Sequence, residues 1–360
     1  MTKEEKKEAI DKLTGLLAES KNVYLADISG MDADQTSKLR RLCFSKGVQV
    51  QVVKNTLLKR AMESCEKDYN ELYDVLKGNT SMMLSETANA PAKAITEFLK
   101  KNKNADKPLF KGAYVEESIY SADQLKILET LKSKEELTCM KAAMEVAEIG
   151  VAKMRQDLKA GMTEDELWSI LHKTNIEHGG EWIECRILSS GERTNPWMQE
   201  SSNKIIQQGE IVSFDTDMVG PYGYCADISR TYVCGNHFNN EQKKLYLMAV
   251  EQIDYNSRLI KAGVSFKEFT EKSWKLPDDY YGNRYSVMAH GIGMCDEWPA
   301  IRYPTDGGER SGIFQKNMTI TLESYIGKVG GKEGVKLEQQ YLIGENGLEL
   351  MSHHPLERIK

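Results

Sequence analysis

The chain has 360 residues, with 54 acidic and 48 basic side chains and a net charge of −6, so no general basic field indicates a nucleic-acid-binding protein. No apolar run approaches the roughly 20 residues of a membrane span. The first residues are charged from Lys3 onward, unlike a secretory signal. The seven cysteines form no CxxC pair and are odd in number, which argues against a disulfide scaffold and a structural zinc site. We therefore expect a cytoplasmic protein without a membrane partner.

Composition divides the chain into two parts. Residues 1–137 are rich in lysine and contain no tryptophan, whereas all five tryptophans lie in the later part of the chain. Glycine-rich turns also gather late, at HGIG (290–293) and KVGGKEG (328–334). We place the boundary in LKSKEEL at the end of the first part, and we expect two domains, 1–137 and 138–360.

The first domain is predicted to alternate helices and strands. An apolar stripe near the start indicates an amphipathic helix. A strand is expected over 22–29, a helix from Asp32 or Asp34 through Cys43, and a second strand over 48–53. This order of elements predicts a small α/β domain.

The segments YLADISGM, LRRLCFSKGV, VVKNTLLKRAM and VLKGNTSMM follow one another in the first domain. In this order they resemble the N-terminal domain of bacterial ribosomal protein L10. The resemblance implies docking on 23S ribosomal RNA through Lys54, Asn55 and Arg60, and phosphate contacts commonly use such side chains at turns and helix ends. The family continues into a helix that carries the L7/L12 stalk, and this chain changes character where that helix should begin.

The second domain is expected to open with a long helix. TCMKAAMEVAEIGVAKMRQDLKAG (138–161) carries an apolar side and ends in Gly161. Thr163 then fits the N-cap of a further helix, with Glu166 at the capping-box position. Strands and turns are predicted from there to the end, which indicates an α+β domain.

Carboxylates and one imidazole recur on apolar strands of the second domain. Such a set of ligands suits iron, zinc, manganese or cobalt, and bound cations offset the cost of burying several carboxylates together. Two ions roughly 3.5–4 Å apart are a recurring catalytic arrangement. The six residues are Asp215, Asp217, Asp227, His290, Glu323 and Glu338.

The order Asp…Asp…His…Glu…Glu, with GYCADISRT and HGIG around it, resembles the pita-bread catalytic domain of methionine aminopeptidases, Xaa-Pro peptidases and creatinase. The resemblance covers 138–360 and implies Asp227 and Glu338 as bridging ligands. Those peptidases keep a Pro-His pair where this chain has Trp197, and a histidine in HExP where it has Asp296. Because those histidines bind and protonate the intermediate and the leaving amine, their replacement is expected to impair peptide hydrolysis.

The aspartate-containing segment departs from the peptidase pattern as well. FDTDMVGPYGYCADISR adds Asp217 and lengthens the usual spacing from Asp215 to Asp227 by one, to twelve. Together with ERTNPWMQE and AHGIGMCDEWP, it resembles the DddP group of dimethylsulfoniopropionate lyases, in which a pita-bread site cleaves a C–S bond to give dimethyl sulfide and acrylate. The resemblance implies that all six residues bind two divalent metal ions, usually iron.

A β-elimination needs a base at the carbon next to the substrate carboxylate. The resemblance implies Asp296, close to Trp298 in the chain, as this base, and Tyr285 as a further catalytic residue. The sulfonium of a small zwitterionic substrate suits aromatic faces, and the candidates are Trp197, Trp298 and Tyr285. A homodimer through the catalytic half is also expected. Two alternatives stay open, an Xaa-Pro peptidase-like metallohydrolase and a 23S rRNA-binding protein of the L10 type.

Overall fold

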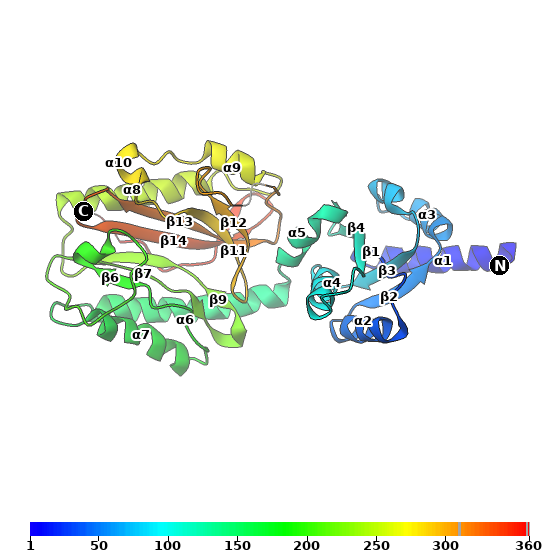
Figure 1. Ribbon diagram of the computed structural model, residues 1–360, viewed down its shortest axis with the longest axis horizontal. Helices are drawn as coiled ribbons and strands as arrows, with labels where there is room; N and C mark the ends of the chain where they lie inside the picture. Colours follow the sequence, from blue (N-terminus) through cyan, green and yellow to red (C-terminus); the bar gives the residue numbers. More distant parts are fainter. Residues whose placement is uncertain (309–310, 358, 360) are drawn as a thin grey trace. The chain divides into compact units, whose positions relative to one another are not determined.

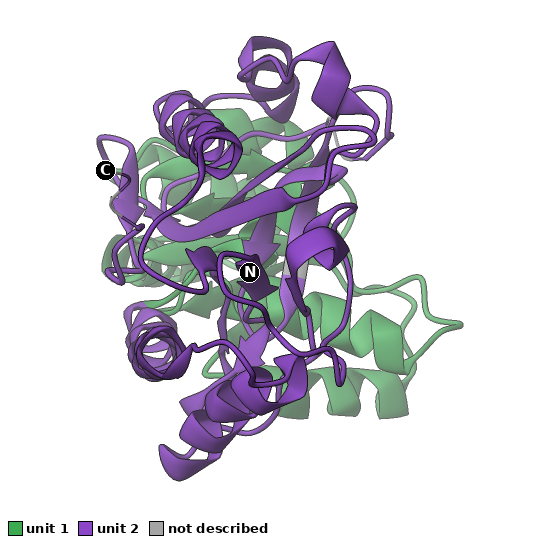
Figure 2. Ribbon diagram, turned by 90° about the vertical axis from the view of Figure 1, so that its left-hand side faces the viewer, with its two compact units in different colours: residues 1–133 green, residues 134–360 purple. Residues whose placement is uncertain are grey.

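The computed structural model describes residues 1–308, 311–357 and 359. They form two compact units, Met1–Ser133 and Lys134–Lys360, which Figure 2 colours separately. The division expected after residue 137 lies near the start of the helix that opens the second unit. Within the described ranges, no helix is both long enough and apolar enough to span a bilayer.

The first unit contains a five-stranded antiparallel sheet in the order β2-β3-β1-β4-β5. Its central strand β1 pairs Tyr24 with Met83 on one side and with Ala113 on the other. The elements are α1 (Lys3–Glu19), β1 (Asn22–Asp27), α2 (Ala33–Ser45), β2 (Gln49–Val53), α3 (Asn55–Glu63), η1 (Asn70–Val75), β3 (Thr80–Ser85), α4 (Ala90–Lys101), β4 (Leu109–Val115), β5 (Ser118–Ser121), η2 (Ala122–Gln124) and α5 (Leu125–Thr130).

Local sequence signals explain where the helices of the first unit begin. The Asp32 side chain accepts the backbone N–H of Gln35 at 2.7 Å, while the Gln35 side chain accepts the N–H of Asp32, so α2 starts in a capping box. A core that includes Leu17, Leu58 and Met82 then packs α1 and α3 on the sheet. The mixed α/β character predicted for this unit is confirmed.

The second unit contains sheets of three strands, in the order β10-β7-β6, and of five strands, in the order β12-β11-β13-β14-β15, with a short β8-β9 hairpin. Its helices are α6 (Lys134–Asp157), α7 (Glu164–Glu177), α8 (Asn240–Ser257), α9 (Phe266–Lys272) and α10 (Asp278–Tyr281), with short turns η3 (Gly191–Thr194) and η4 (Pro221–Gly223). Its strands are β6 (Leu188–Ser190), β7 (Ile211–Asp215), β8 (Met218–Val219), β9 (Cys225–Ala226), β10 (Ser229–Val233), β11 (Val287–Ile292), β12 (Asp296–Arg302), β13 (Thr319–Gly327), β14 (Gly334–Ile343) and β15 (Leu348–Leu350).

Strand β14 lies where the two larger sheets of the second unit meet. The backbone N–H of Lys336 donates to Thr231 Oγ1 at 3.1 Å, and the Thr231 hydroxyl donates to the Lys336 carbonyl at 2.8 Å. Helix α8 lies on one side of the strands, with α6 and α7 on the other (Figure 1). The strands are therefore covered on both sides by helices, which explains why strand residues such as Thr321 and Glu338 are fully buried.

The first helix of the second unit differs from its expected bounds. It begins at Lys134 and ends at Asp157, whereas the sequence predicted 138–161. Gly161 has a positive φ of 94°, and its N–H donates to the carbonyl of Ile206 rather than to the helix. The chain thus leaves the helix early because a distant segment satisfies the backbone at Gly161. The next prediction is confirmed, because Thr163 and Glu166 form the capping box of α7.

Candidate metal centre

A short hairpin positions the three aspartates. Asp215 ends β7, and Asp227 follows β9 directly. The hydroxyl of Thr216 donates to the carbonyl of Ala226 at 2.9 Å and accepts the N–H of Ile228 at 2.9 Å. These bonds hold the segments that carry Asp215 and Asp227 against each other, which is why residues twelve positions apart can share one site.

The other three predicted ligands come from the five-stranded sheet. His290 lies on β11 opposite Thr321, and Glu323 on β13 lies directly opposite Glu338 on β14. Like charges placed opposite each other across a strand pair are destabilising unless a cation lies between them. The pairing of Glu323 with Glu338 is therefore stable only if a positive charge lies near both carboxylates.

His290 marks the place where these groups converge. Its Nε2 lies 3.5 Å from Asp227 Oδ2, 3.4 Å from Glu323 Oε1 and 3.5 Å from Glu338 Oε1. The other ring nitrogen, Nδ1, lies 3.0 Å from the carbonyl of Gly291. A carbonyl can only accept, so this contact favours the tautomer that leaves Nε2 as the ligand atom.

The arrangement fits bound metal on two counts. Ligand atoms of Asp227, His290 and Glu338 lie within 4.8 Å of one another, and so do carboxylate oxygens of Asp217, Asp227 and Asp296. Asp227 belongs to both groups, as a bridging ligand would. Glu338 Oε1 is buried and has no hydrogen-bond partner among the described residues. A cation would satisfy this oxygen, since buried carboxylate oxygens are otherwise paired.

The raised pKa values of the clustered carboxyl groups also indicate that the metal-free site lacks positive charge. Burial and the neighbouring Glu338 raise the pKa of Asp215 to about 6 and that of Glu323 to about 7. Burial and nearby carboxylates also raise the pKa of Asp227 well above its ordinary value. A divalent ion would reverse these shifts, because it favours the charged form of every carboxylate around it.

Asp217 and Asp296 lie closer to solvent than the other acidic residues. Asp217 has a positive φ of 35° and accepts a hydrogen bond from the Cys185 thiol at 2.8 Å. Asp296 begins β12, has a side chain that is 57% exposed and lies 3.6 Å from His290 Nδ1. This exposure places Asp296 where a bound substrate could reach it.

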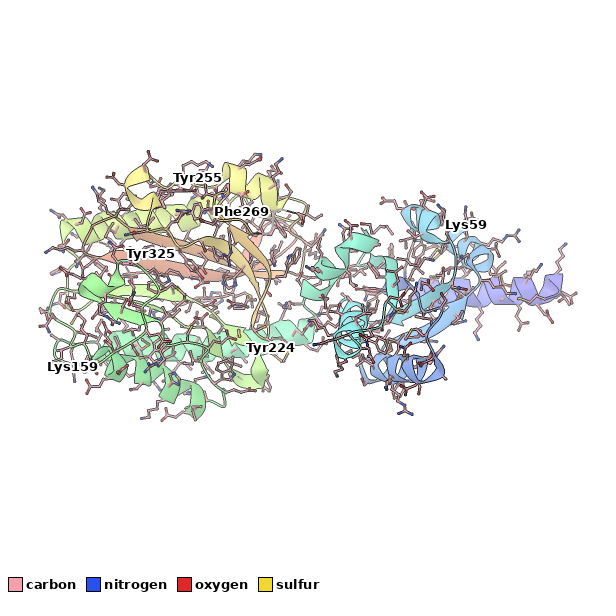
Figure 3. The ribbon with its side chains drawn as sticks, in the orientation of Figure 1. Lys59, Lys159, Tyr224, Tyr255, Phe269 and Tyr325 are labelled. Carbon is pink, nitrogen blue, oxygen red and sulfur yellow. The ribbon has the colours of Figure 1, made fainter. Side chains whose placement is uncertain are left out.

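The structure brings two of the three predicted aromatic residues to the cluster. The rings of Trp197 and Tyr285 each lie 5.4 Å from Lys336 Nζ. Trp197 is buried and also packs against Tyr325 of β13, 6.0 Å between centroids; Tyr325 is labelled in Figure 3. Trp298 packs edge-on against Phe266, at 5.4 Å. Trp197 and Tyr285 are thus joined to the site through Lys336.

Lys336 was missed although the sequence carries a signal for it. Its side chain is completely buried, and its Nζ contacts carboxylate oxygens of Asp215, Glu323 and Glu338. Side chains two residues apart on a strand point to the same face. A lysine two positions before the expected ligand Glu338 is therefore predicted to face the same site. Cys185 was missed as well, and we find no signal in the sequence that indicates its contact with Asp217.

The predicted RNA-binding residues lie along α3 of the first unit, with Lys54 and Asn55 at its start and Arg60 near its end. Lys54 is the exposed N-cap residue of this helix, and Arg60 is exposed on its last turn. The side-chain amide of Asn55 donates to the carbonyl of Gly78 at 2.8 Å. Lys54 and Arg60 can therefore face an anionic partner, whereas part of the Asn55 side chain is engaged within the unit.

Two family models match different parts of the chain. The family model of metallopeptidase family M24 matches residues 138–345, and that of ribosomal protein L10 matches residues 1–100. Dimethylsulfoniopropionate lyase DddP of Roseovarius nubinhibens is 40% identical over 236 residues, which cover 63% of this chain and 53% of the relative. The chain therefore spans about half the length of that lyase.

The first unit and the fold of the second have further relatives. Large ribosomal subunit protein uL10 of Christiangramia forsetii is 61% identical over 138 residues, which cover 38% of this chain and 78% of the relative. The crystal structure of X-Pro aminopeptidase from Thermotoga maritima superposes with a TM-score of 0.57 and 26% identity, covering 66% of each chain. The chain therefore belongs to metallopeptidase family M24, with a pita-bread metalloenzyme fold in its second unit, and its first unit belongs to the ribosomal protein L10 family.

Proposed function

We propose that the second unit is a dinuclear-metal lyase that cleaves dimethylsulfoniopropionate into dimethyl sulfide and acrylate. The observation that supports this most is the group formed by Asp217, Asp227 and Asp296, whose carboxylate oxygens lie within 4.8 Å of one another. Asp217 and Asp296 depart from the peptidase pattern, and the relative that shares 40% identity with this half of the chain is named a dimethylsulfoniopropionate lyase.

Asp215, Asp217, Asp227, His290, Glu323 and Glu338 would hold the ions. Two divalent ions, iron first and otherwise zinc, manganese or cobalt, would supply Lewis acidity toward the substrate carboxylate. Asp296 takes the proton from the carbon next to that carboxylate. The electron pair of this C–H bond forms the carbon–carbon double bond of acrylate. The bond between carbon and sulfur breaks, and its electrons leave with sulfur as neutral dimethyl sulfide.

Tyr285 has a different part in this proposal. Burial and the neighbouring Glu323 raise the pKa of its hydroxyl above the ordinary value, so the side chain stays protonated at neutral pH and can donate a hydrogen bond but not act as the base. Its ring and that of Trp197 offer aromatic faces to the sulfonium. Trp298 would contribute only if the substrate extends toward Phe266, against which its ring packs.

The test uses the full chain loaded with ferrous iron. Purified protein is expected to release dimethyl sulfide, measured by gas chromatography, with one acrylate formed per dimethyl sulfide. Asp296→Asn is expected to lose this activity and to retain its metal by elemental analysis. An iron-loaded wild type that binds metal and yields no dimethyl sulfide would show that the site is not this lyase.

A peptidase acting on Xaa-Pro peptides is the second candidate, and it is favoured by the fold that the second unit shares with X-Pro aminopeptidase. Hydrolysis of Xaa-Pro dipeptides by the metal-loaded chain, without release of dimethyl sulfide, would support it. Trp197 and Asp296 weigh against this candidate because neither can replace a histidine as a proton carrier near neutral pH without a large change in its surroundings.

For the first unit we propose binding to 23S ribosomal RNA through Lys54, Asn55 and Arg60. Lys54→Ala and Arg60→Ala are each expected to reduce the dependence of log K on log salt by about 0.7–0.9, the value of one phosphate contact. Lys103→Ala is a suitable control, because Lys103 is also exposed but lies outside α3. Equal effects of all three changes would indicate general charge attraction and contradict a specific site.

A further inference from the structure

Lys336 is the one fully buried lysine side chain that the described structure places among carboxylates of the candidate metal centre. Its Nζ lies 2.7 Å from Glu323 Oε2, 3.0 Å from Asp215 Oδ2 and 3.2 Å from Glu338 Oε2. It also donates to the Ser229 hydroxyl at 2.5 Å, and that hydroxyl donates to Glu338 Oε2 at 2.9 Å. The ammonium is thus surrounded by acceptors rather than by water.

Aromatic rings hold the other sides of this ammonium. Trp197 and Tyr285 each lie 5.4 Å from Nζ, a distance at which a ring face attracts a cation. A buried lysine on a flexible four-carbon stem is costly unless its charge is paired. Here carboxylates and aromatic rings enclose the Lys336 ammonium, and these contacts fix its position.

Lys336 and His290 contact opposite oxygens of the same two glutamates. Lys336 Nζ lies against the Oε2 atoms of Glu323 and Glu338, whereas His290 Nε2 lies 3.4 and 3.5 Å from their Oε1 atoms. A carboxylate whose one oxygen is fixed keeps the other fixed as well. Lys336 therefore directs the free oxygens of both glutamates toward His290.

The number of charges gives Lys336 a second role. The six expected ligands include five carboxylates, namely Asp215, Asp217, Asp227, Glu323 and Glu338. Two divalent ions would supply four positive charges, and one negative charge would remain buried. The Lys336 ammonium supplies the missing positive charge, so the six expected ligands, two divalent ions and Lys336 are together neutral; Asp296, whose side chain is 57% exposed, is not counted among them.

We propose that Lys336 is a positioning residue of the metal centre, a fixed cation that orients Glu323 and Glu338 before metal binds and balances the charge that Asp217 adds. This inference rests on the proposed dinuclear site and concerns its assembly rather than its reaction. Lys336 does not act on the substrate, because Asp215, Glu323, Glu338 and the two rings enclose its ammonium.

The test measures binding of Mn²⁺ alone to the metal-free full chain by titration calorimetry. K336M is expected to lower Mn²⁺ affinity by about 10–100-fold, the loss typical of removing a residue that orients metal ligands. K332M is the matched control, since Lys332 is an exposed lysine in the loop before β14, and it is expected to bind Mn²⁺ as the wild type does. Unchanged affinity in K336M would overturn the proposal.

A double-mutant cycle separates charge balance from simple damage. If Lys336 offsets the charge of Asp217, the loss of affinity in K336M combined with D217N is expected to be smaller than the product of the two separate losses. Losses that multiply would show that the two residues are independent and would overturn the charge-balance role. Should K336M not fold, as judged by circular dichroism, K336R against K336Q carries the same test, because only the arginine keeps the charge.

The outcomes distinguish this inference from the proposed lyase. Mn²⁺ affinity that depends on Lys336, in a chain that releases no dimethyl sulfide, would overturn the lyase proposal and leave the positioning role intact. Conversely, a chain with lyase activity whose Mn²⁺ affinity is the same with and without Lys336 would overturn only the positioning role.

Discussion

Metal should stabilise the second unit, and the size of the effect follows from mass action. Free metal at one hundred times its dissociation constant contributes about 2.7 kcal/mol to the free energy of unfolding. For a domain of the size of Lys134–Lys360, each kcal/mol shifts the midpoint of thermal unfolding by about 2–4 °C. We therefore expect saturating Mn²⁺ to raise this midpoint by about 5–11 °C over the same protein in chelator.

Tryptophan fluorescence is a selective assay for this shift. All five tryptophans lie in the second unit, after residue 160, so their emission follows the unfolding of the second unit and does not report on the first. Asp227→Asn removes the carboxylate that belongs to both groups of candidate metal ligands, and it is expected to abolish the shift in the unfolding midpoint. A shift of the same size in Asp227→Asn and wild type, or no shift in wild type at saturating Mn²⁺, would refute the site.

The pH dependence of the shift follows from the same carboxylates. The pKa values of Asp215 and Glu323 in the metal-free fold, about 6 and about 7, lie above those of the unfolded chain because of burial and Glu338. A carboxyl group with a raised pKa favours the fold at low pH, and this contribution is lost as pH rises through the folded pKa. Metal needs the ionised groups. The stabilisation by Mn²⁺ is therefore expected to be larger at pH 8 than at pH 5, and the reverse order would contradict the assignment.

Three further changes test other parts of the chain. Asp296→Asn is expected to lower kcat for dimethyl sulfide release by about 10²–10⁴-fold, as for loss of a general base, with metal content unchanged; loss of metal would make Asp296 a ligand instead. Burial raises the pKa of Asp27, but hydrogen bonds from Lys107 and Ser29 outweigh it and lower the pKa to about 2. The carboxylate therefore stabilises the fold above its unfolded pKa, and this contribution is lost as pH falls through 2. Lys107→Met is expected to reduce this acid-dependent loss, as followed by far-ultraviolet circular dichroism, and an unchanged acid dependence would contradict the role of the pair. Glu164 is fully buried, accepts hydrogen bonds from Ser190 and Ser202, and forms an ion pair with Arg193. Glu164→Ala is expected to lower the free energy of unfolding by about 3–5 kcal/mol, measured by urea unfolding followed by tryptophan fluorescence. A loss below about 1 kcal/mol would show that these contacts are not needed for stability.

Much of the fold could be predicted because its signals are local. Asp32 and Thr163 begin helices by accepting hydrogen bonds from residues three positions away. Such contacts can be recognised from a few consecutive residues of the sequence. The end of α6 could not be predicted, since the N–H of Gly161 bonds to the carbonyl of Ile206. That contact depends on how a distant segment packs, which no short stretch of sequence contains.

The candidate metal site could likewise be predicted only in part from the sequence. The convergence of Asp227, His290 and Glu338 was expected from the resemblance, and the structure brings their ligand atoms together. The contact between Cys185 and Asp217 could not be predicted, because it joins a loop to a residue with an unusual backbone angle. Lys336 could have been found from strand alternation, but lysine is so seldom fully buried that composition argues for the surface.

The replacement of the peptidase histidines by Trp197 and Asp296 can be explained by the charge of the proposed substrate. A peptide bond is neutral, and its cleavage needs groups that carry protons to a leaving amine. Dimethylsulfoniopropionate brings its own fixed positive charge, and its leaving group needs no proton. An accessible carboxylate at Asp296 and aromatic rings at Trp197 and Tyr285 suit such a cation better than histidines would. Because Lys336 already lies over one face of each ring, the sulfonium of the proposed substrate would take a ring face turned away from this ammonium, where like-charge repulsion is weaker.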